Sequence, residues 1–148
     1  MKYTEEVKDL FTVSDEYYLA HCISADFGMG AGIAVEFINR FNMKEKLKSQ
    51  FPQYVTYYHV SNIKGDCLLV DRTFNLITKE RVYQKPTYKS ITNALLEMKK
   101  ICLEKNITKI AMPLIGCGID KLEWDRVSSI ILDVFNETDI EILVCKIE

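Results

Sequence analysis

The stretch AMPLIGCGID, residues 111–120, is the part of the sequence that decides the fold. It starts as a buried apolar run, turns at Gly116 and Gly118, and ends on the carboxylate of Asp120. A helical pattern of apolar residues begins directly afterwards, at Leu122. A strand that ends in a glycine turn before a helix is the usual place where an α/β protein binds a phosphate group. We therefore expect the two glycines to approach a ligand and Asp120 to face it.

A second glycine-rich stretch, SADFGMGAG, occupies residues 24–32. It follows the apolar run 17–23, which is typical of a buried strand, and precedes apolar residues at helical spacing over 33–41. Three alternating glycines allow a backbone to curl closely around a ligand. The spacing is neither that of a dinucleotide fingerprint nor that of a phosphate-binding P-loop. The pattern predicts a strand, a ligand-binding loop and a helix, in that order.

Strand and helix patterns alternate in the later part of the chain, and such alternation requires a sheet that is at least partly parallel, with helices on both faces. The expected fold class is therefore α/β. We expect strands at residues 1–7, 17–23, 54–60, 67–70, 74–78, 108–114 and 140–145, helices at 33–41, 88–105 and 122–135, and a short exposed helix or loop at 44–51.

Size and composition indicate one domain over residues 1–148, with 48% hydrophobic and 27% charged residues. The net charge of −2 argues against a dedicated nucleic-acid binder. Five cysteines without CxxC spacing and only two histidines indicate no metal site. No signal peptide or membrane-spanning run is present, so we expect a cytoplasmic protein with reduced thiols and no membrane partner.

Three strand ends are expected to meet at one edge of the sheet: residues 24–32, Lys79 and residues 115–120. Backbone amides of two glycine loops suit a diphosphate. Lys79 and Asp120 are the candidate reacting groups, because a neutral amine can attack a sugar aldehyde carbon to form a Schiff base while a carboxylate moves the proton. The alternative is a surface lysine and a helix-capping aspartate.

Four other side chains have two possible roles each. Asp9 follows the first strand and would either accept hydrogen bonds from a ligand's amino group or form an Asx turn or helix cap. His21 lies within an apolar run and is more typical of a hydrogen-bonded core histidine than of a base. Cys22 and Cys117 lie near the expected site, but only His21 is available as a partner, so a cysteine nucleophile is not favoured.

Five motifs occur together and in register along nearly the whole chain. They are AHCIS (20–24) with MGAGIAV (29–35), LITK (76–79), KPTY (85–88), PLIGCGID (113–120) and LEW (122–124). Together they resemble the macrodomain family. The similarity is most specific to its terminal ADP-ribose protein glycohydrolase branch, which removes ADP-ribose from modified glutamate or aspartate.

The resemblance implies a three-layer α/β/α macrodomain around a mixed, mostly parallel sheet, with ADP-ribose as the ligand and product and no cofactor. It also implies that Lys79 attacks the anomeric carbon of the distal ribose, giving a covalent lysyl–ADP-ribose intermediate, and that Asp120 is the acid and base that resolves it. The implied ligand-binding residues are Asp9 and Leu10 beside the adenine, Ser24, Met29, Gly30, Ala31 and Gly32 along the distal ribose and diphosphate, and Leu114, Ile115, Gly116, Cys117, Gly118 and Ile119 around the other side of the diphosphate.

The same resemblance implies ADP-ribosylated proteins as partners. We also expect the protein to be a monomer. The expected pocket would equally serve hydrolysis of ADP-ribose from a nucleic-acid base, deacetylation of O-acetyl-ADP-ribose, or binding of ADP-ribose without turnover. The presence of both Lys79 and Asp120 favours an enzyme over a binding module. The sequence departs from the family pattern at Leu114, where a basic residue is expected, at Phe27-Gly28 and across 42–71.

Overall fold

A computed structural model describes residues 1–56, 65–118 and 120–147. Its strands form a six-stranded sheet in the order β1-β6-β5-β2-β4-β3. Every neighbouring pair is parallel except β3 and β4. The predicted mixed, mostly parallel sheet is therefore confirmed. The strands are β1 (Lys2–Val7), β2 (Tyr18–Ser24), β3 (Asp66–Val70), β4 (Thr73–Lys79), β5 (Lys109–Met112) and β6 (Glu141–Lys146).

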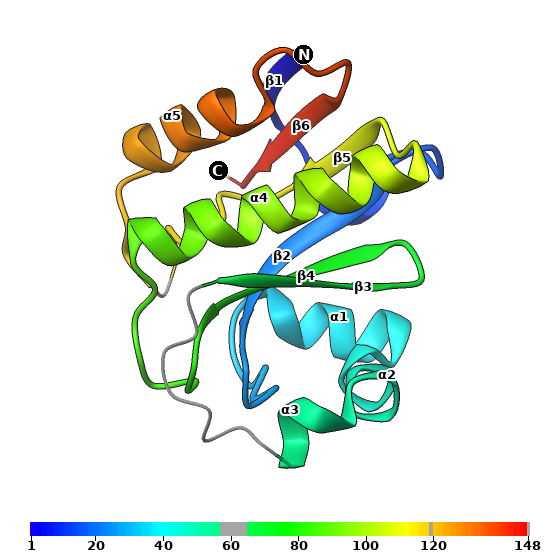
Figure 1. Cartoon of the computed structure of the whole chain (residues 1–148), viewed down its shortest axis with the longest axis vertical. Helices are drawn as coiled ribbons and strands as arrows, with labels where there is room; N and C mark the ends of the chain where they lie inside the picture. The colour runs from blue at the N-terminus through cyan, green and yellow to red at the C-terminus, as the bar shows by residue number, and fades with distance from the viewer. Residues whose placement is uncertain (57–64, 119, 148) are drawn as a thin grey trace.

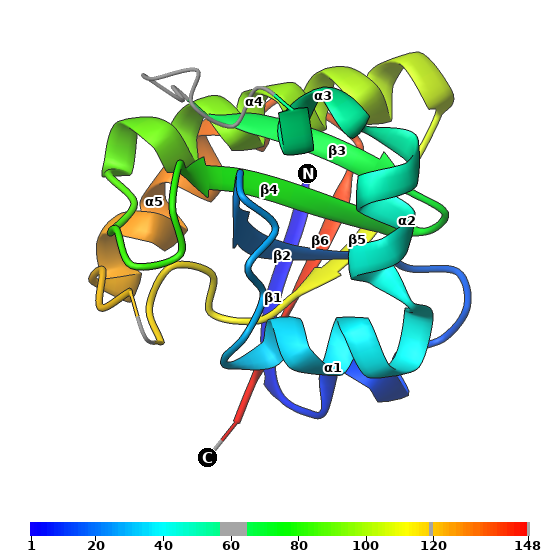
Figure 2. The ribbon, with the colours of Figure 1, turned by 90° about the horizontal axis from the view of Figure 1, so that it is seen from below.

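Helices cover both faces of the sheet, as Figures 1 and 2 show from two directions. Helices α4 and α5 lie on one face, and α1 and α2 lie on the other, with the short α3 beside α2. The predicted three-layer α/β/α arrangement is confirmed. The helices are α1 (Ile33–Phe41), α2 (Met43–Gln50), α3 (Pro52–Thr56), α4 (Tyr88–Lys105) and α5 (Trp124–Phe135), and a 3₁₀ turn, η1, spans Leu10–Thr12. Within the described ranges, no helix is both long and apolar enough to cross a bilayer.

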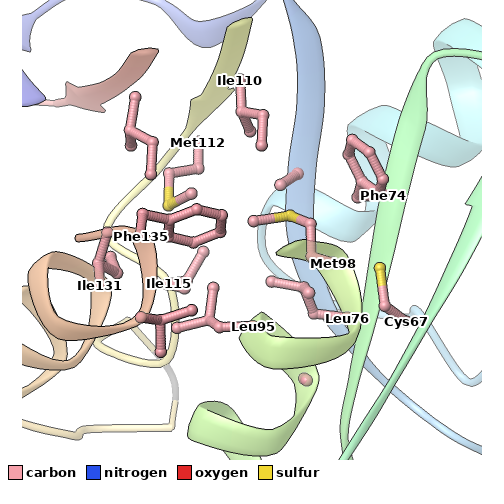
Figure 3. Close-up of a cluster of buried hydrophobic side chains, with 14 of the residues drawn as sticks. Cys67, Phe74, Leu76, Leu95, Met98, Ile110, Met112, Ile115, Ile131 and Phe135 are labelled. Atoms are coloured by element: carbon pink, nitrogen blue, oxygen red, sulfur yellow. The ribbon is translucent and has the colours of Figure 1, made fainter. Parts of the chain in front are cut away.

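Each helical layer packs on its own core, because successive side chains of a strand point to opposite faces. On β6, Ile142 and Val144 lie in the core beneath α4 and α5, whereas Leu143 and Cys145 lie in the core beneath α1 and α2. Figure 3 shows the first of these cores, where side chains from β4, β5, α4 and α5 meet. The alternation fixes which residues at the strand ends face which layer.

Helix α4 begins and ends where the sequence predicts. The Thr87 hydroxyl accepts a hydrogen bond from the Ser90 amide and the Ser90 hydroxyl accepts one from the Thr87 amide, both at 3.0 Å, which is a capping box. At the other end Asn106 adopts the left-handed conformation that terminates helices. The Ser90 hydroxyl also donates to the Thr78 carbonyl at 2.7 Å. The start of α4 is thereby fixed against the end of β4.

A crevice lies between the ends of β2 and β5, where the chain leaves the two strands towards opposite faces of the sheet. These two strands pair over only two positions, Tyr18 with Ile110 and Leu19 with Ala111. Beyond them, β2 leads into α1 on one face of the sheet and β5 leads towards α5 on the other. Such a switch point at the carboxyl ends of parallel strands is where ligands bind in open α/β sheets.

Two expected strands differ in the structure. Residues 54–56 of the expected strand 54–60 belong to α3, and residues 57–60 lie outside the described residues. Pro52 suits the first position of a helix, and the ring of Tyr54 packs against Phe27, so tertiary packing overrides the β propensity of the tyrosine. The expected strand 108–114 ends at Met112, because Pro113 has no amide to donate to a neighbouring strand.

Two helices also differ from expectation. Helix α5 starts at Trp124 and not at Leu122, since the Leu122 amide donates to the Gly116 carbonyl at 2.9 Å instead. The stretch expected as an exposed helix or loop is α2, and it buries Met43 and Leu47. Neither change moves the strand ends on which the expected site depends.

Candidate active site

An elongated cleft crosses the carboxyl ends of the parallel strands. One part, of about 380 Å³, lies between the two glycine loops, residues 24–32 and 113–120. The other part, of about 750 Å³, lies beside η1 and the ends of β1 and β6. The two parts adjoin each other, because they share lining residues, namely Gly32, Ile33, Pro113, Cys145 and Ile147. The combined size is that of a ligand-binding site.

Lys79 and Asp120 meet in the smaller part of the cleft. The Lys79 Nζ donates to Asp120 Oδ1 at 2.7 Å. Their side chains are only 11% and 17% exposed, so the ion pair is partly shielded from water but still reachable from the cleft. One side chain comes from the end of β4 and the other from the loop that follows β5. The structure therefore brings together the two residues that the sequence predicts as reacting groups.

A β-bulge directly precedes Lys79. On β2 and β4, Ile23 pairs with Ile77 and the next pair is Ser24 with Lys79, so Thr78 is an extra residue in β4. Bulges bend a strand and change the direction of nearby side chains, and they are frequent beside active sites. The bulged residue is held through the hydrogen bond from Ser90 to its carbonyl.

The first glycine loop is anchored by two buried apolar side chains. Phe27 and Met29 both have left-handed backbones, with φ of 53° and 51°, yet their side chains are 0% and 3% exposed. Burial of the two side chains offsets the cost of that conformation. The Lys44 ammonium group, in a stretch expected to be a solvated face, also donates to the Gly28 carbonyl at 3.2 Å.

The exposed end of this loop forms the cleft wall. Gly30, Ala31 and Gly32 line the cleft and lead into α1, whose N-cap is Gly32. The first amides of a helix have no partner within the helix and attract anions. These sequence-predicted binding residues therefore lie where a phosphate group can reach a helix N-terminus.

Ser24 is held by a residue that the sequence analysis missed. The Ser24 hydroxyl, almost fully buried, donates to Asp26 Oδ1. The same oxygen accepts from the Gly28 amide at 3.0 Å, and Oδ2 accepts from the Val82 amide at 3.1 Å. An aspartate two residues after a strand end is a typical Asx-turn position, so the signal was present.

The second glycine loop depends on one of its two glycines. Gly116 has a φ of +73°, and a Cβ there would lie 2.7 Å from Ile91 Cδ1 and 3.1 Å from Leu122 Cδ1. A Cβ on Gly118 would meet no described atom within 4 Å. The neighbouring Ile115 lines the cleft while its side chain lies in the core beneath α4 and α5 (Figure 3). Leu114 and Cys117 also line the cleft, and Ile119 lies outside the described residues.

Three cysteines line the cleft, and the two that lie near the expected reacting groups, Cys22 and Cys117, are protonated thiols. Burial, together with the nearby charge of Asp120, raises the pKa of the Cys22 thiol to about 12. Burial raises the pKa of the Cys117 thiol to about 11. A thiol attacks as its thiolate, so neither group is suited to be a nucleophile at neutral pH. This agrees with the interpretation of the sequence.

His21 is a core histidine, as expected. It is fully buried, its ring stacks on Phe37 of α1 with 3.8 Å between centroids, and its Nε2 lies 2.7 Å from Asn75 Oδ1. Burial lowers the pKa of the imidazole to about 4. The ring is therefore neutral at physiological pH and does not reach the cleft.

Asp9 and Leu10 line the larger part of the cleft. The Asp9 carboxylate caps η1 by accepting from the Phe11 amide at 2.9 Å, so its structural role is observed, while its contact with a ligand stays a prediction. Arg40, which the sequence analysis missed, lines the same wall with its guanidinium 4.4 Å from the centre of the Phe11 ring.

The arrangement combines an amine, a carboxylate and two loops with exposed backbone. In the part of the chain that the structure describes, no group of three or more His, Cys, Asp or Glu side chains is placed to hold a metal ion. Chemistry by the chain's own groups therefore centres on the contact between Lys79 and Asp120, with the loops available to orient a phosphate-containing ligand.

Comparison with known proteins gives a consistent result. The Macro domain family model matches residues 26–131. The protein named ADP-ribose glycohydrolase OARD1 from Homo sapiens is 43% identical over 136 residues, which cover 92% of this chain and 86% of that protein. The equivalent protein from Bos taurus matches to the same extent.

Solved structures agree on the fold. The macrodomain of Mycobacterium tuberculosis DarG aligns with a TM-score of 0.79 and 22% identity, covering 99% of this chain and 97% of that chain. At this identity the likeness concerns the fold alone. Together with the family model and the relatives at 43% identity, it leads to one conclusion: this chain belongs to the Macro domain family.

Proposed function

We propose that this protein is an ADP-ribose glycohydrolase, which releases mono-ADP-ribose from modified glutamate or aspartate side chains of proteins. The observation that carries the proposal is the 2.7 Å contact between Lys79 and Asp120 at the end of a cleft with two glycine loops. The names of the relatives at 43% identity support the activity. A module that only binds ADP-ribose has no need of a shielded amine and carboxylate beside the sugar.

The two parts of the cleft suit the two ends of ADP-ribose. The diphosphate would lie between the two glycine loops, where the N-terminus of α1 supplies amides. The adenosine would occupy the larger part, beside Asp9 and Leu10. The distal ribose would then lie at Lys79. Binding by backbone amides is consistent with a protein of net charge −2, since it requires no cluster of basic side chains.

The reaction would proceed in two steps, with Asp120 moving one proton in each. In the first, Asp120 takes a proton from the Lys79 ammonium, and the neutral amine attacks the anomeric carbon. The bond from that carbon to the substrate carboxylate breaks, its electrons leave with the oxygen, and Asp120 passes the proton to the departing acid. The product of this step is a lysyl–ADP-ribose intermediate.

In the second step, water replaces the lysine. Asp120, ionised again, takes a proton from the water as the oxygen attacks the anomeric carbon. The bond between this carbon and the Lys79 nitrogen breaks, and the nitrogen keeps the electron pair. Asp120 then returns the proton to the amine, which restores the ion pair. The observed hydrogen bond would be the path for the transfers between Lys79 and Asp120, one in each step.

The test measures release of ADP-ribose from an auto-ADP-ribosylated protein by wild type, Lys79→Ala and Asp120→Ala. Loss of a group that acts in the chemical step is expected to lower the rate by at least about 100-fold. Lys100→Ala and Asp133→Ala are matched controls, because both side chains are exposed on the outer helices. Variants at 79 and 120 that retain the wild-type rate would overturn the proposal.

A panel of substrates separates the related activities. It contains protein modified at glutamate or aspartate, single-stranded DNA modified on a base, and O-acetyl-ADP-ribose. Fastest release from the modified protein is expected. Preference for modified DNA or for O-acetyl-ADP-ribose would contradict the proposed substrate, and calorimetric binding of ADP-ribose without any release would indicate a binding module.

A further inference from the structure

The first glycine loop and the loop that follows Lys79, residues 80–86, meet at Asp26. Both oxygens of its carboxylate are used at this contact, which we call the loop junction (Asp26, Gly28 and Val82). Oδ1 accepts from the Ser24 hydroxyl and the Gly28 amide, within the first loop. Oδ2 accepts from the Val82 amide, across the junction.

We propose that Asp26 is a positioning residue that sets the place of Lys79 relative to Ser24 and the cleft; this inference rests on the proposed function. Asp26 lies beside the cleft wall and not among the reacting groups. Its effect would pass through the backbone on both sides of the junction. Hydrogen bonds to an ionised carboxylate are about twice as strong as neutral ones, which suits this role.

Backbone pairing connects the junction directly to Lys79. The Ala25 amide donates to the Lys79 carbonyl at 2.9 Å, and the Asp26 amide donates to the Glu80 carbonyl at 3.2 Å. These bonds continue the pairing of β2 with β4 beyond the bulge at Thr78. The Asp26 carboxylate adds a bond to Val82 and so extends the connection by another two residues. A displacement of the junction would therefore be transmitted to the residue that carries the amine.

Close packing at Gly28 supports the same role independently. A Cβ built on Gly28 would lie 2.9 Å from the Val82 Cβ and 3.0 Å from its Cγ2. The φ of Gly28 is not in the left-handed region, so space and not backbone conformation requires the glycine. The two loops thus approach so closely that a single methyl group would separate them.

The loop that carries Val82 needs such a contact, because much of it is exposed. Val82 lines the cleft next to Lys79, yet it is 47% exposed, and its neighbour Tyr83 is 81% exposed. Exposed loops with few apolar contacts open readily unless hydrogen bonds hold them. The Asp26 carboxylate supplies one of these bonds from the side of the first loop.

The experiment compares Asp26→Asn and Gly28→Ala with wild type. Asparagine has one acceptor oxygen and one donor nitrogen, so it cannot accept all three hydrogen bonds. Alanine at 28 keeps the aspartate in place in the sequence but adds a Cβ that would lie 2.9 Å from the Val82 Cβ and 3.3 Å from Asp26 Oδ1, so it presses on the junction by steric contact. Rates are measured in single turnover with enzyme in excess. Calorimetry with ADP-ribose gives the fraction of each protein that is competent to bind, and the measured rate divided by this fraction is the corrected rate. Asp71→Asn is the matched control, because Asp71 is exposed, pairs with Lys46, and has a left-handed backbone that asparagine tolerates.

Both junction variants are expected to lower the corrected rate about tenfold or more, because misplacement of a reacting group by about 1 Å can cost about 100-fold. The fall in rate should exceed the fall in ADP-ribose affinity. The corrected rate of the Asp26→Asn/Gly28→Ala double variant should fall by a smaller factor than the product of the two single-variant factors, since both substitutions act on one contact. A corrected rate equal to that of wild type in Asp26→Asn would overturn the inference, since a purely structural role lowers only the competent fraction.

Amide hydrogen exchange at Val82 keeps this test separate from the test of the proposed function. Wild-type protein that binds ADP-ribose but releases none would overturn the proposed function. In that case hydrogen exchange of the Val82 amide alone tests whether Asp26 holds the two loops together. Faster exchange of the Val82 amide in Asp26→Asn than in wild type and Asp71→Asn supports the junction, and unchanged exchange contradicts it.

Discussion

The two glycine loops line the same cleft but hold their shape by different means. The first loop has non-glycine residues in left-handed conformation, Phe27 and Met29, and buries their side chains beneath α1 and α2. The second loop places a glycine, Gly116, at its left-handed position, buries Ile115 in the core beneath α4 and α5, and packs Leu114 and Cys117 against that core. The first loop is held mainly by two buried side chains, whereas the second requires a position without a side chain, at Gly116.

The difference shows that the glycines of a loop do not by themselves identify all of its residues with a positive φ. In the first loop Gly28 and Gly30 do not have a positive φ, whereas Gly32, Phe27 and Met29 do, and the last two look like ordinary core residues in the sequence. In the second loop the demand falls on Gly116 and not on Gly118. Substitutions in the two loops should therefore differ in their effect on stability: truncation at Phe27 should destabilise the first loop most, and enlargement at Gly116 should destabilise the second.

The largest expected effect is that of truncating the anchor of the first loop. Phe27→Ala removes a fully buried ring and is expected to lower the free energy of unfolding by about 3–5 kcal/mol. Tyr83→Ala, which truncates an aromatic residue that is 81% exposed, is the control and should change it by less than about 0.5 kcal/mol. Urea denaturation measures both. Equal stability of the two variants would show that Phe27 does not anchor the loop.

Enlargement at Gly116 should have the next largest effect. Gly116→Ala adds a left-handed strain of about 1–2 kcal/mol. Overpacking against Ile91 adds about 1–3 kcal/mol more. The same urea titration should show a loss of about 2–5 kcal/mol, the sum of these contributions. A variant as stable as wild type would mean that the loop relaxes freely.

Lowering the pH should destabilise the helical layer that anchors the first loop, because His21 packs in that layer. The pKa of this imidazole is lowered to about 4 in the folded protein, below the ordinary value of 6.5, so the unfolded chain binds the proton more readily. Stability contributed by the neutral ring is complete above pH 6.5 and is lost as pH falls towards 4.

Over the range from pH 6.5 to 4.5 the expected loss is about 2–3 kcal/mol. The pKa values of Glu5 and Glu141 are also lowered, by hydrogen bonds from Tyr3 and Tyr17 respectively, so these carboxylates affect stability at lower pH. Urea titrations in this range, repeated with His21→Gln, isolate the histidine. A pH dependence that survives in His21→Gln would have another source.

The smallest effect is expected at Gly118. Because no described atom lies within 4 Å of a Cβ at this position, Gly118→Ala should change the free energy of unfolding by less than about 0.5 kcal/mol. Paired with Gly116→Ala in one denaturation series, it tests whether the two glycines differ as the geometry requires. A loss as large as that of Gly116→Ala would refute the distinction.

Much of the fold follows from periodicity in the sequence. The strands and helices around both glycine loops lie within two residues of where the apolar patterns predict them. Both ends of α4 are also where the sequence predicts, because Thr87 and Asn106 carry local capping signals. Residues 54–56 are the clearest failure. Their β propensity is local, whereas the packing of Tyr54 on Phe27 is a tertiary contact that no short pattern encodes.

The convergence of Lys79 and Asp120 could be predicted because parallel strands end at one edge. The loop junction could not be predicted from the sequence. Asp26 has a local signal for a turn, but its bond to Val82 joins residues 56 positions apart and depends on the bulge in β4. Ile115 could be assigned to the cleft from sequence, but its side chain lies in the core, since residues in a turn do not follow a regular period.

The most direct test of covalent chemistry at Lys79 is mass spectrometry of Asp120→Ala after addition of modified protein. Without the acid and base the second step should slow most, so the intermediate should accumulate. We expect a mass increase of one ADP-ribose, localised by peptide mapping to Lys79 and absent from the Lys79→Ala/Asp120→Ala double variant. Substrate bound at saturation with no adduct on Lys79 would contradict the proposed mechanism.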